Sequence, residues 1–416
     1  MTPKEQKYDM VIIGGGAAGL SGAVEALSQY PNLKLAVLER QSRVGKKLLA
    51  TGNGRCNYTN TKIAETSYFG DTERAKPALS RFTPQNNIRF FQKLGIYPRY
   101  EEDGRVYPYS NQAAAFVDAL RMAIPALSGE IITDSPVTSV KKEKKGFSLS
   151  TPKGIITCKR LILASGGPAA PNLGGSRLGL ELAASLGHRI LEPMPALTGL
   201  KTENSLTKAL KGIRYTGGLS LYEGAENLRL LTGEVLFTEY GLSGIAAMSL
   251  SCSLPTKPNK SLKVKLDLLP ELTLNEAVSI LKERQKDLFY LSLENFLTGL
   301  VNKKIGQLLA KGCLNKPLST DVSALTPGDL RKLAAALKGL EIPLYGGNGW
   351  NQAQVSAGGV DMAQVEPETL ASLKCPGLYL AGEILNVYGD CGGYNLQWAW
   401  SSGRLAALSA AESLGE

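Results

Sequence analysis

A glycine-rich motif near the start of the chain provides the first chemistry that residue types and spacing suggest. Residues 14–19 read Gly-Gly-Gly-Ala-Ala-Gly and match the pattern G-x-G-x-x-G. In this pattern Gly14 permits a tight turn, Gly16 lets a pyrophosphate approach the backbone, and Gly19 lets a helix pack closely on a strand. Glu39 lies twenty residues beyond Gly19, where a carboxylate can accept hydrogen bonds from an adenosine ribose. The motif therefore predicts dinucleotide binding.

The elements around the motif must present it to the phosphates. Residues 8–13 form an apolar run typical of a buried strand, residues 17–30 have helical composition, and residues 33–38 are a second strand. Ala17 and Ala18 then occupy the first helical turn, where free N–H groups and the positive end of the helix dipole favour an anion. The alternative is a purely structural glycine turn, which does not account for Glu39.

Later segments decide which dinucleotide is expected. Short strands joined by tight turns at 137–140, 146–150 and 154–158 resemble a β-meander, and a fourth strand, 160–164, runs into Ser165-Gly166-Gly167. This arrangement resembles the FAD-binding fold of the glutathione reductase/fumarate reductase class. A second glycine motif of this kind after a strand is missing from the sequence. We therefore expect non-covalent FAD and no dedicated NAD(P)H domain, so that NAD(P)H would dock only transiently.

Two further segments carry groups suited to a flavin. The loop from Gly45 to Asn57 is basic and punctuated by glycine, and its Lys47, Arg55 and Asn57 are donors for flavin carbonyls or phosphates. An ordinary surface loop is the alternative. A strand ending in Ala381-Gly382-Glu383 is followed by Gly392-Gly393, which opens a helix expected from Leu396 to Ser413. Its N-terminus is expected to face the flavin pyrimidine ring and to favour the anionic reduced flavin.

Several motifs resemble the YhiN/BaiN-like flavoproteins, the family that includes aminoacetone oxidases. They are Thr51-Gly-Asn-Gly-Arg-Cys-Asn57, Phe237-Thr-Glu-Tyr-Gly-Leu-Ser-Gly244, Val355-Ser-Ala-Gly-Gly-Val360 and Gly389-Asp-Cys-Gly-Gly-Tyr-Asn-Leu-Gln-Trp-Ala-Trp-Ser-Ser-Gly403. The resemblance extends from residue 8 to the C-terminus. It implies FAD contacts at Gly14, Gly16, Ala17, Ala18, Gly19, Glu39, Arg40, Lys47, Leu48, Gly54, Arg55, Asn57, Val137, Ala164, Ser165, Gly166, Gly382, Glu383, Gly393, Asn395 and Leu396.

The chain departs from this family at two places. Glu239 stands where the family often has histidine, and Asn386-Val387-Tyr388 replaces an Asp-Val-Asp sequence. Both changes are expected near the substrate, so the resemblance does not identify the substrate or a catalytic acid or base. We assign no catalytic residue.

The order of these motifs predicts an α/β fold with an insertion. A Rossmann-like FAD-binding domain is expected from residues 1–192 and 346–416. An inserted substrate or cap domain, 193–345, would contain a β-rich part (193–271 and 326–345) and a helical part (272–325). Residues 274–311 appear helical throughout. Thr326-Pro327 starts one further short helix, Leu330 to Leu337.

Composition limits the class of protein. Hydrophobic residues make up 43% and charged residues 20% of the 416 residues, as in a folded globular protein. The polar start, Met1 to Tyr8, predicts no signal peptide, and no apolar run approaches the ~18 residues of a membrane helix. Six cysteines without C-x-x-C spacing and one histidine, His188, predict no metal site. A reducing cytoplasm is the expected location.

The net charge of +10 leaves the partner open. The densest basic run, Lys141-Lys-Glu-Lys-Lys-Gly146, has no interleaved aromatic residues and is expected to be a solvated hairpin, so we expect no nucleic-acid partner. The expected reaction is hydride transfer between flavin N5 and a small amine, ketone or enone, in a cleft between the two domains, with NAD(P)H or O2 as second substrate. An RNA-modifying flavoprotein and a non-catalytic flavin-bound regulator remain as alternatives.

Overall fold

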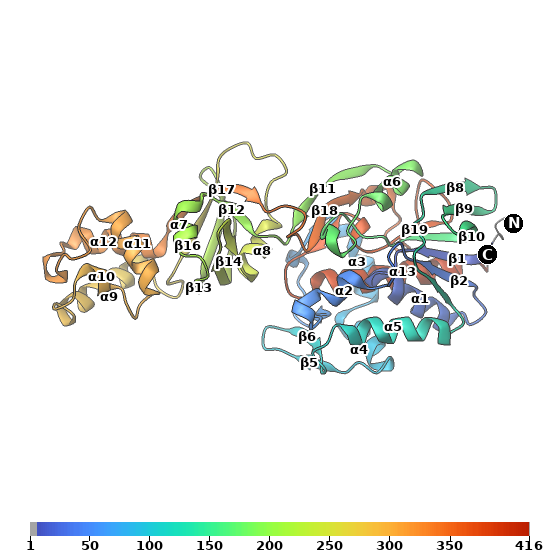
Figure 1. Ribbon diagram of the computed structural model, residues 1–416, viewed down its shortest axis with the longest axis horizontal. Helices are drawn as coiled ribbons and strands as arrows, with labels where there is room; N and C mark the ends of the chain where they lie inside the picture. Colours follow the sequence, from blue (N-terminus) through green and yellow to red (C-terminus); the bar gives the residue numbers. More distant parts are fainter. Residues whose placement is uncertain (1–5, 416) are drawn as a thin grey trace. The chain divides into compact units, whose positions relative to one another are not determined.

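The computed structural model describes residues 6–415, and their contacts divide the chain into two units. One unit joins the segment that ends at Ala196 to the segment that begins at Trp350, and the other spans Leu197–Gly349 (Figure 1). The boundaries lie four residues beyond those expected from the sequence. Each unit has its own hydrophobic core. The polar stretch before Gln6, from which we expected no signal peptide, lies outside the described residues.

The first unit is built on a seven-stranded sheet of order β7-β2-β1-β10-β9-β8, with β19 also paired to β10. The strands β7, β2, β1, β10 and β19 are parallel, and β9 and β8 are antiparallel additions. Parallel strands place their carboxyl ends at one edge, where ligands bind in folds of this type. The strands are β1 (Gln6–Ile13), β2 (Leu35–Leu38), β7 (Glu130–Ile132), β8 (Ser139–Glu143), β9 (Gly146–Thr151), β10 (Gly154–Leu163) and β19 (Leu378–Leu380).

One strand corrects the sequence-based expectation. The segments expected as separate strands at 154–158 and 160–164 form the single strand β10, which ends at Leu163. Along one side it pairs with β1, and along the other it pairs first with β9 and then with β19. The polar pair Lys159-Arg160 interrupts the apolar pattern without interrupting the backbone pairing. The basic run at 141–146 does lie in a hairpin, in which residues 141–143 end β8 and Lys144 and Lys145 form the turn to β9.

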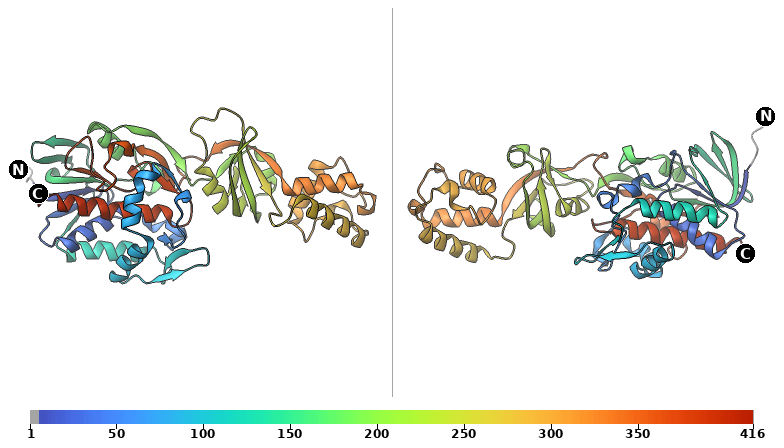
Figure 2. Two further views of the ribbon diagram at one scale, coloured as in Figure 1. Left: turned by 180° about the vertical axis from the view of Figure 1, so that it is seen from behind. Right: turned by 60° about the horizontal axis from the view of Figure 1, so that its bottom comes forward.

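Two helices of this unit pack with their backbones close together. Helix α1 (Ala17–Gln29) runs beside α13 (Tyr394–Glu412), as Figures 1 and 2 show. A Cβ atom on Gly22 would lie 2.5 Å from the carbonyl oxygen of Gly403, and one on Gly403 would overlap with the backbone of Ala18. Glycine at both positions allows this approach, which joins the N-terminal segment to the C-terminal segment.

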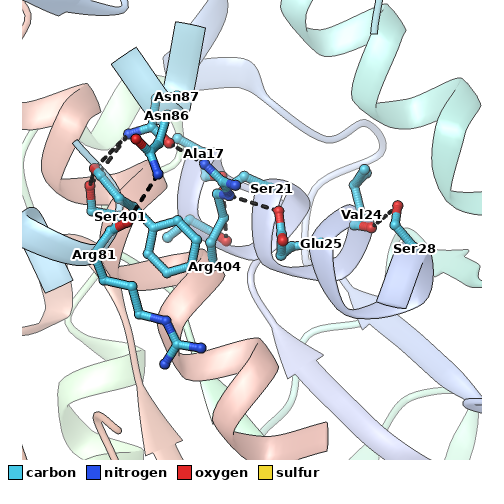
Figure 3. Close-up of polar contacts among 12 residues, drawn as sticks. Ala17, Ser21, Val24, Glu25, Ser28, Arg81, Asn86, Asn87, Ser401 and Arg404 are labelled. Carbon is cyan, nitrogen blue, oxygen red and sulfur yellow. Dashed lines mark hydrogen bonds and ion pairs between the residues drawn. The ribbon is translucent and has the colours of Figure 1, made fainter. Parts of the chain in front are cut away.

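A buried charged network fastens these helices to α4 (Pro84–Lys93) (Figure 3). Arg404 donates from Nε to Glu25 Oε2 (2.8 Å) and from Nη1 to Asn87 Oδ1 (2.7 Å). Its guanidinium lies over the rings of Phe82 (4.3 Å) and Phe90 (4.4 Å). The side chains of Arg404 and Glu25 are only 9% and 12% exposed. A buried charge of this kind depends on its partner, because neither group can regain water.

Replacing Arg404 by methionine is therefore expected to lower the stability of this unit by about 3–5 kcal/mol, because Glu25 is left buried and unpaired. A lower melting temperature of the unit in calorimetry would measure this. Arg81→Met is the matched control, since Arg81 is 48% exposed and makes only a solvent-exposed ion pair with Glu412 (3.8 Å) and a longer contact with Phe82 (5.8 Å). Adding Glu25→Gln to Arg404→Met should restore part of the loss. Equal melting temperatures for the two arginine variants would contradict the expectation.

Smaller elements complete the first unit. Three small sheets pair β6 with both β3 and β5, β20 with β4, and β11 with β18. Their bounds are β3 (Thr59–Asn60), β4 (Tyr68–Gly70), β5 (Pro98–Tyr100), β6 (Arg105–Pro108), β11 (Ile190–Ala196), β18 (Val355–Val360) and β20 (Val387–Gly389). The remaining α-helices are α2 (Lys46–Leu49), α3 (Thr72–Arg81), α5 (Ala114–Ala126) and α6 (Leu178–Ser185).

The second unit contains a closed β-barrel of order β12-β15-β14-β13-β16-β17, which β12 and β17 close. The sequence predicted strands here but not a barrel. The strands are β12 (Leu200–Thr202), β13 (Arg214–Glu223), β14 (Glu226–Phe237), β15 (Gly241–Ser243), β16 (Leu262–Asp267) and β17 (Leu340–Gly347). Two short helices, α7 (Asn204–Ala209) and α8 (Ile245–Ser251), accompany the barrel.

The rest of the unit is a helical lobe, and it corrects two expectations. Residues 274–311 are not helical throughout but form three helices, α9 (Leu274–Asp287), α10 (Leu293–Phe296) and α11 (Lys303–Cys313). The segment 326–345 is largely the helix α12 (Pro327–Lys338) rather than β-rich. The expected cap is confirmed, because Thr326 and Asp329 form a capping box around Pro327.

None of the helices within residues 6–415 combines the length and apolar character needed to cross a membrane. The same residues contain no cluster of three histidine, cysteine or acidic side chains placed to hold a metal ion. His188 lies after α6 with Nε2 2.8 Å from Ser372 Oγ, and burial lowers its pKa. This environment is that of a structural histidine.

Candidate cofactor site

The glycine turn after β1 opens directly onto the start of α1. Gly14 has φ +113°, and a Cβ atom there would overlap with the carbonyl of Ala164. A Cβ atom on Gly16 would meet no atom within 4 Å, so space is open at the residue that precedes the helix. No side chain caps α1, whose first-turn N–H groups have no intrahelical acceptors. Gly14, Gly16 and Ala17 are partly exposed, whereas Ala18 and Gly19 are buried.

Glu39 stands at the end of β2, beside this turn. Its Oε2 accepts the Gly15 N–H (2.9 Å) and its Oε1 accepts the Gln41 N–H (2.8 Å). The carboxylate is partly exposed and retains lone pairs for hydroxyl donors. Arg40 is exposed and donates to the Gly174 carbonyl (2.7 Å). Val137 is buried, so only its backbone is suited to a contact.

The carboxyl ends of β10 and β19 contribute two more segments. Ala164 is buried, and Ser165 has a buried hydroxyl that makes no hydrogen bond with any described residue. At Gly166, φ is +70° and the nearest atom to a Cβ would be Glu383 Oε2, 4.0 Å away. Gly382 has φ +77° and packs against Ala18. Gly166 therefore lies opposite the Glu383 carboxylate, beyond the carboxyl ends of β10 and β19.

Glu383 is held in this position by three groups. Lys47 Nζ lies 2.6 Å from its Oε2, and the N–H and hydroxyl of Ser356 donate to its Oε1, both at 2.9 Å. The Ser356 hydroxyl also accepts the Ala169 N–H (3.1 Å). Ser356 belongs to the motif Val355–Val360, but no role was predicted for it from the sequence. Its distance in the sequence from both β10 and Glu383 explains why it was missed.

The basic loop from Gly45 to Asn57 matches only part of what was expected of it. Gly54 and Arg55 are exposed, and Arg55 lies over Tyr107 (4.2 Å to the ring centroid) and 3.3 Å from Glu101. Leu48 is buried. Asn57 has a buried Oδ1 atom without a hydrogen-bond donor among the described residues. The loop thus contributes an unsatisfied acceptor, while its cations already have protein partners.

The Oδ1 atom of Asn57 lies next to the start of α13. Gly393 precedes the helix with φ +99°, and no side chain caps the helix. A Cβ atom on Gly393 would lie 2.5 Å from the Thr59 carbonyl oxygen and 2.9 Å from Asn57 Oδ1. The protein backbone itself therefore crowds this position and requires glycine. Leu396 is partly exposed, and the Asn395 amide bonds to the backbone N–H and carbonyl of Gly389, both at 2.8 Å.

The two cysteines near these loops do not suit a redox pair. Cys56 is fully buried, and burial raises its pKa to about 12. Burial also raises the pKa of Cys391. Both thiols therefore keep their protons near neutral pH, where a thiolate would be needed for exchange.

The assembled groups fit FAD. Two uncapped helix N-termini, at α1 and α13, offer N–H donors. Glu39 offers a carboxylate to the donors of a ribose, and Asn57 Oδ1 and Ser165 Oγ are buried polar atoms without partners. Buried polar atoms in folded proteins are nearly always hydrogen-bonded. Similar orphans occur elsewhere, as at Tyr215 and Ser409, so it is the position of these two atoms beside the glycine turn and the start of α13 that points to a ligand.

Replacing Asn57 by leucine is expected to have different effects on the FAD-free and the FAD-bound protein. Without FAD the melting temperature should not fall, because an unsatisfied buried oxygen is removed. With FAD the affinity should fall by about 0.5–1.5 kcal/mol, or roughly 2- to 13-fold, because one hydrogen bond is lost. Titration of FAD by fluorescence and a thermal melt of each state would measure both effects. Asn351→Leu, at an exposed site in the same unit, is the control; an Asn57 variant with unchanged affinity would contradict the assignment.

Comparisons with solved structures show the same fold. Quinol fumarate reductase FrdA of Escherichia coli matches with a TM-score of 0.51 and 14% identity, covering 100% of this chain and 71% of that one. The 3-ketosteroid delta1-dehydrogenase of Sterolibacterium denitrificans matches with a TM-score of 0.53 and 12% identity, covering 98% and 100%. The expected α/β fold with a Rossmann-type FAD-binding domain is confirmed.

Comparisons with sequences give the family. A 3-dehydro-bile acid delta(4,6)-reductase of Clostridium scindens is 36% identical over 96% of this chain and 98% of its own. Ribosomal RNA dihydrouridine synthases of Escherichia coli and Haemophilus influenzae are each 30% identical, over 95% and 97% of this chain and 96% and 98% of their own. The expected class, a flavin-dependent oxidoreductase, is confirmed. The model of the HI0933-like protein Rossmann domain matches residues 8–409, and the chain belongs to this HI0933-like family.

Proposed function

We propose that this protein is an FAD-dependent reductase of a carbon–carbon double bond conjugated to a carbonyl group. The observation that carries the proposal is the orphaned, uncapped dinucleotide cradle in a chain that matches two kinds of named reductive enzyme over nearly its whole length. Their names describe one bond change. A 3-dehydro-bile acid with delta(4,6) unsaturation is a conjugated ketone, and dihydrouridine is uridine with its ring C=C bond reduced. This narrows the expected amine, ketone or enone to an enone.

Different groups of the residues predicted from the sequence would contact different parts of FAD. The N–H groups of Gly16, Ala17 and Ala18 at α1 would meet the pyrophosphate. Glu39 would accept the adenosine ribose hydroxyls, while the Val137 backbone would contact the adenine. The backbone and side chains of Ala164, Ser165, Gly166, Gly382 and Glu383 would line the ribityl chain.

The flavin ring would lie against the loop and the last helix. Asn57 Oδ1 is an acceptor for a ring N–H, and the Asn395 and Leu396 N–H groups are donors for a ring carbonyl. The other residues predicted as FAD contacts would surround the cofactor: Arg40, Lys47, Leu48, Gly54, Arg55 and Gly393. FAD, when bound and reduced, supplies the hydride for the β-carbon of the enone, and a proton is added at the α-carbon. The two electrons would come from a nicotinamide dinucleotide that docks transiently, which is the role proposed for NAD(P)H.

The test is an anaerobic experiment read at the flavin absorbance band. NADH and NADPH are each added to the FAD-loaded protein, followed by an amine, a saturated ketone, an enone and an RNA that contains uridine. We expect reduction by a nicotinamide and reoxidation by the enone or the RNA, with a product two mass units heavier. Reduction by the amine without reoxidation by any unsaturated compound would overturn the proposal. A flavin that never changes redox state would favour the non-catalytic regulator.

A second form of this function places the double bond in a uracil base of RNA. The net charge of +10 and the two 30% identical relatives named for ribosomal RNA support this form, whereas the 36% identical bile acid reductase supports the small-molecule form. A uracil ring has a C=C bond conjugated to a carbonyl, so the chemistry at the cofactor is unchanged. The enone and RNA arms of the experiment distinguish the two sources.

A further inference from the structure

Two neighbouring helices of the helical lobe carry an unusual concentration of positive charge. Lys303, Lys304 and Lys311 on α11, with Arg331 and Lys332 on α12, are all exposed. The two helices pack against each other within the second unit, and Figure 1 labels both in the lobe. We call these five residues the α11–α12 basic surface. None of the five forms an ion pair with another residue of the described chain.

Acidic residues balance this surface only in part. The sole acid of α11 and α12 is Asp329, which is buried and caps α12 through Thr326. Glu294 of α10 accepts a hydrogen bond from Gln307 of α11 (3.1 Å) but pairs with none of the five cations. On the barrel of the same unit, by contrast, several cations face carboxylates. Lys211 lies 2.8 Å from Glu239, and Lys263 lies 2.9 Å from Glu341. The α11–α12 basic surface is therefore available to an external anion.

The first turn of α11 gives an independent argument for such an anion. Lys303 and Lys304 occupy its first two positions, after the Asn302 cap. Cations are disfavoured there, because the helix dipole places positive charge at the same end. The first turns of α9 and α12 instead hold Glu276 and Asp329. A bound polyanion would relieve the repulsion at α11.

The same lobe also presents aromatic side chains to solvent. Phe289 and Tyr290, in the turn after α9, are 63% and 68% exposed, and their ring centroids are 5.8 Å apart at an interplanar angle of 88°. Exposed rings in a lobe that also carries exposed cations are typical of proteins on which unpaired bases stack while the phosphates are neutralised. The basic run at 141–146, which we first considered, lacks such rings.

From these observations we infer that the helical lobe binds RNA, with the α11–α12 basic surface on the phosphate backbone and Phe289 and Tyr290 on unpaired bases. The inference rests on the second form of the proposed function, in which the reduced base belongs to RNA. Lys303 and Lys311 are eight residues apart on one helix, a span of about 12 Å, which suits a chain of phosphates better than one small anion.

The test compares two four-site variants of the full-length FAD-loaded protein. The first replaces Lys303, Lys304, Arg331 and Lys332 by glutamine. The control replaces four exposed lysines of the other unit by glutamine, Lys93, Lys141, Lys144 and Lys145. The probe is a labelled RNA hairpin with a uridine-rich loop, and fluorescence anisotropy is measured at several salt concentrations.

The lobe variant should bind the RNA at least tenfold more weakly, and its slope of log K against log salt should be shallower by roughly 3, because about four counterion contacts are lost. The control should change far less. Phe289→Ser with Tyr290→Ser should weaken binding at every salt concentration without changing the slope. All variants should reduce a small enone as the parent does.

Three results would overturn the inference: a lobe variant that binds RNA normally, a parent protein that binds no RNA, or equal binding of the hairpin and polyglutamate. The last would assign the surface to an acidic protein. Failure of the proposed function is a separate result, since RNA binding would persist while neither the enone nor the RNA reoxidised the flavin.

Discussion

Replacing Glu39 by alanine is expected to weaken FAD binding at least 100-fold. The carboxylate would hold two ribose hydroxyls, and each hydrogen bond to a charged acceptor contributes about 1.5–3 kcal/mol, so the loss should reach about 3 kcal/mol or more. It also accepts the Gly15 and Gln41 N–H groups, so its removal loosens the glycine turn itself. Equilibrium titration of the apoprotein with FAD, followed by flavin fluorescence, gives the change in Kd.

Two controls separate this effect from a general loss of structure. Glu181→Ala removes an exposed carboxylate on α6 and should leave the FAD affinity unchanged. Glu39→Gln keeps the shape and one acceptor oxygen, so its loss should be intermediate. An Glu39→Ala protein that still purifies with a full complement of FAD would show that the ribose lies elsewhere.

Replacing Gly393 by valine is expected to have the second largest effect. The residue has φ +99°, and the new Cβ atom would lie 2.5 Å from the Thr59 carbonyl oxygen. A β-branched residue in this conformation costs about 1–3 kcal/mol from backbone strain alone. The overlap should in addition displace the start of α13 and the neighbouring Asn57 Oδ1, and so weaken FAD binding more than tenfold. A thermal melt and an FAD titration measure the two losses.

The chain offers a control for the strain alone. Gly187 has φ +93°, and a Cβ atom there would meet nothing within 4 Å. Gly187→Val should therefore lower the melting temperature while leaving the FAD affinity within about twofold, since it carries only the strain penalty. Equal FAD affinity in the Gly393 and Gly187 variants would remove the start of α13 from the cofactor site.

Local signals in the sequence predicted the elements that depend on local chemistry. The glycine turn at Gly14 and the cap at Thr326 follow from backbone conformations and hydrogen bonds that span only a few residues, and both are present. The continuity of β10 across Lys159-Arg160 was not predictable in this way, because its pairing with β19 involves residues more than two hundred positions away. The closure of the barrel between β12 and β17 has the same origin.

In the candidate site, too, contacts between residues close in the sequence were predictable and contacts between distant segments were not. Gly15 and Glu39 belong to one βαβ segment, so their proximity follows from their spacing. Ser356, which holds Glu383, and Thr59, which crowds Gly393, come from other parts of the chain. Residue types identified Lys47 and Arg55 as donors, but they did not reveal that Glu383 and Glu101 pair with them.

The close packing of α1 on α13 has a consequence for how the protein folds during its synthesis on the ribosome. The barrel strands and the helical lobe are synthesised as one continuous segment and contact each other within it. In contrast, β10 and α1 pack against β19 and α13, which are synthesised only near the end of translation. Chains released early would lack the predicted contacts at Gly382, Glu383, Gly393, Asn395 and Leu396. We therefore expect cofactor uptake to follow the synthesis of the whole chain.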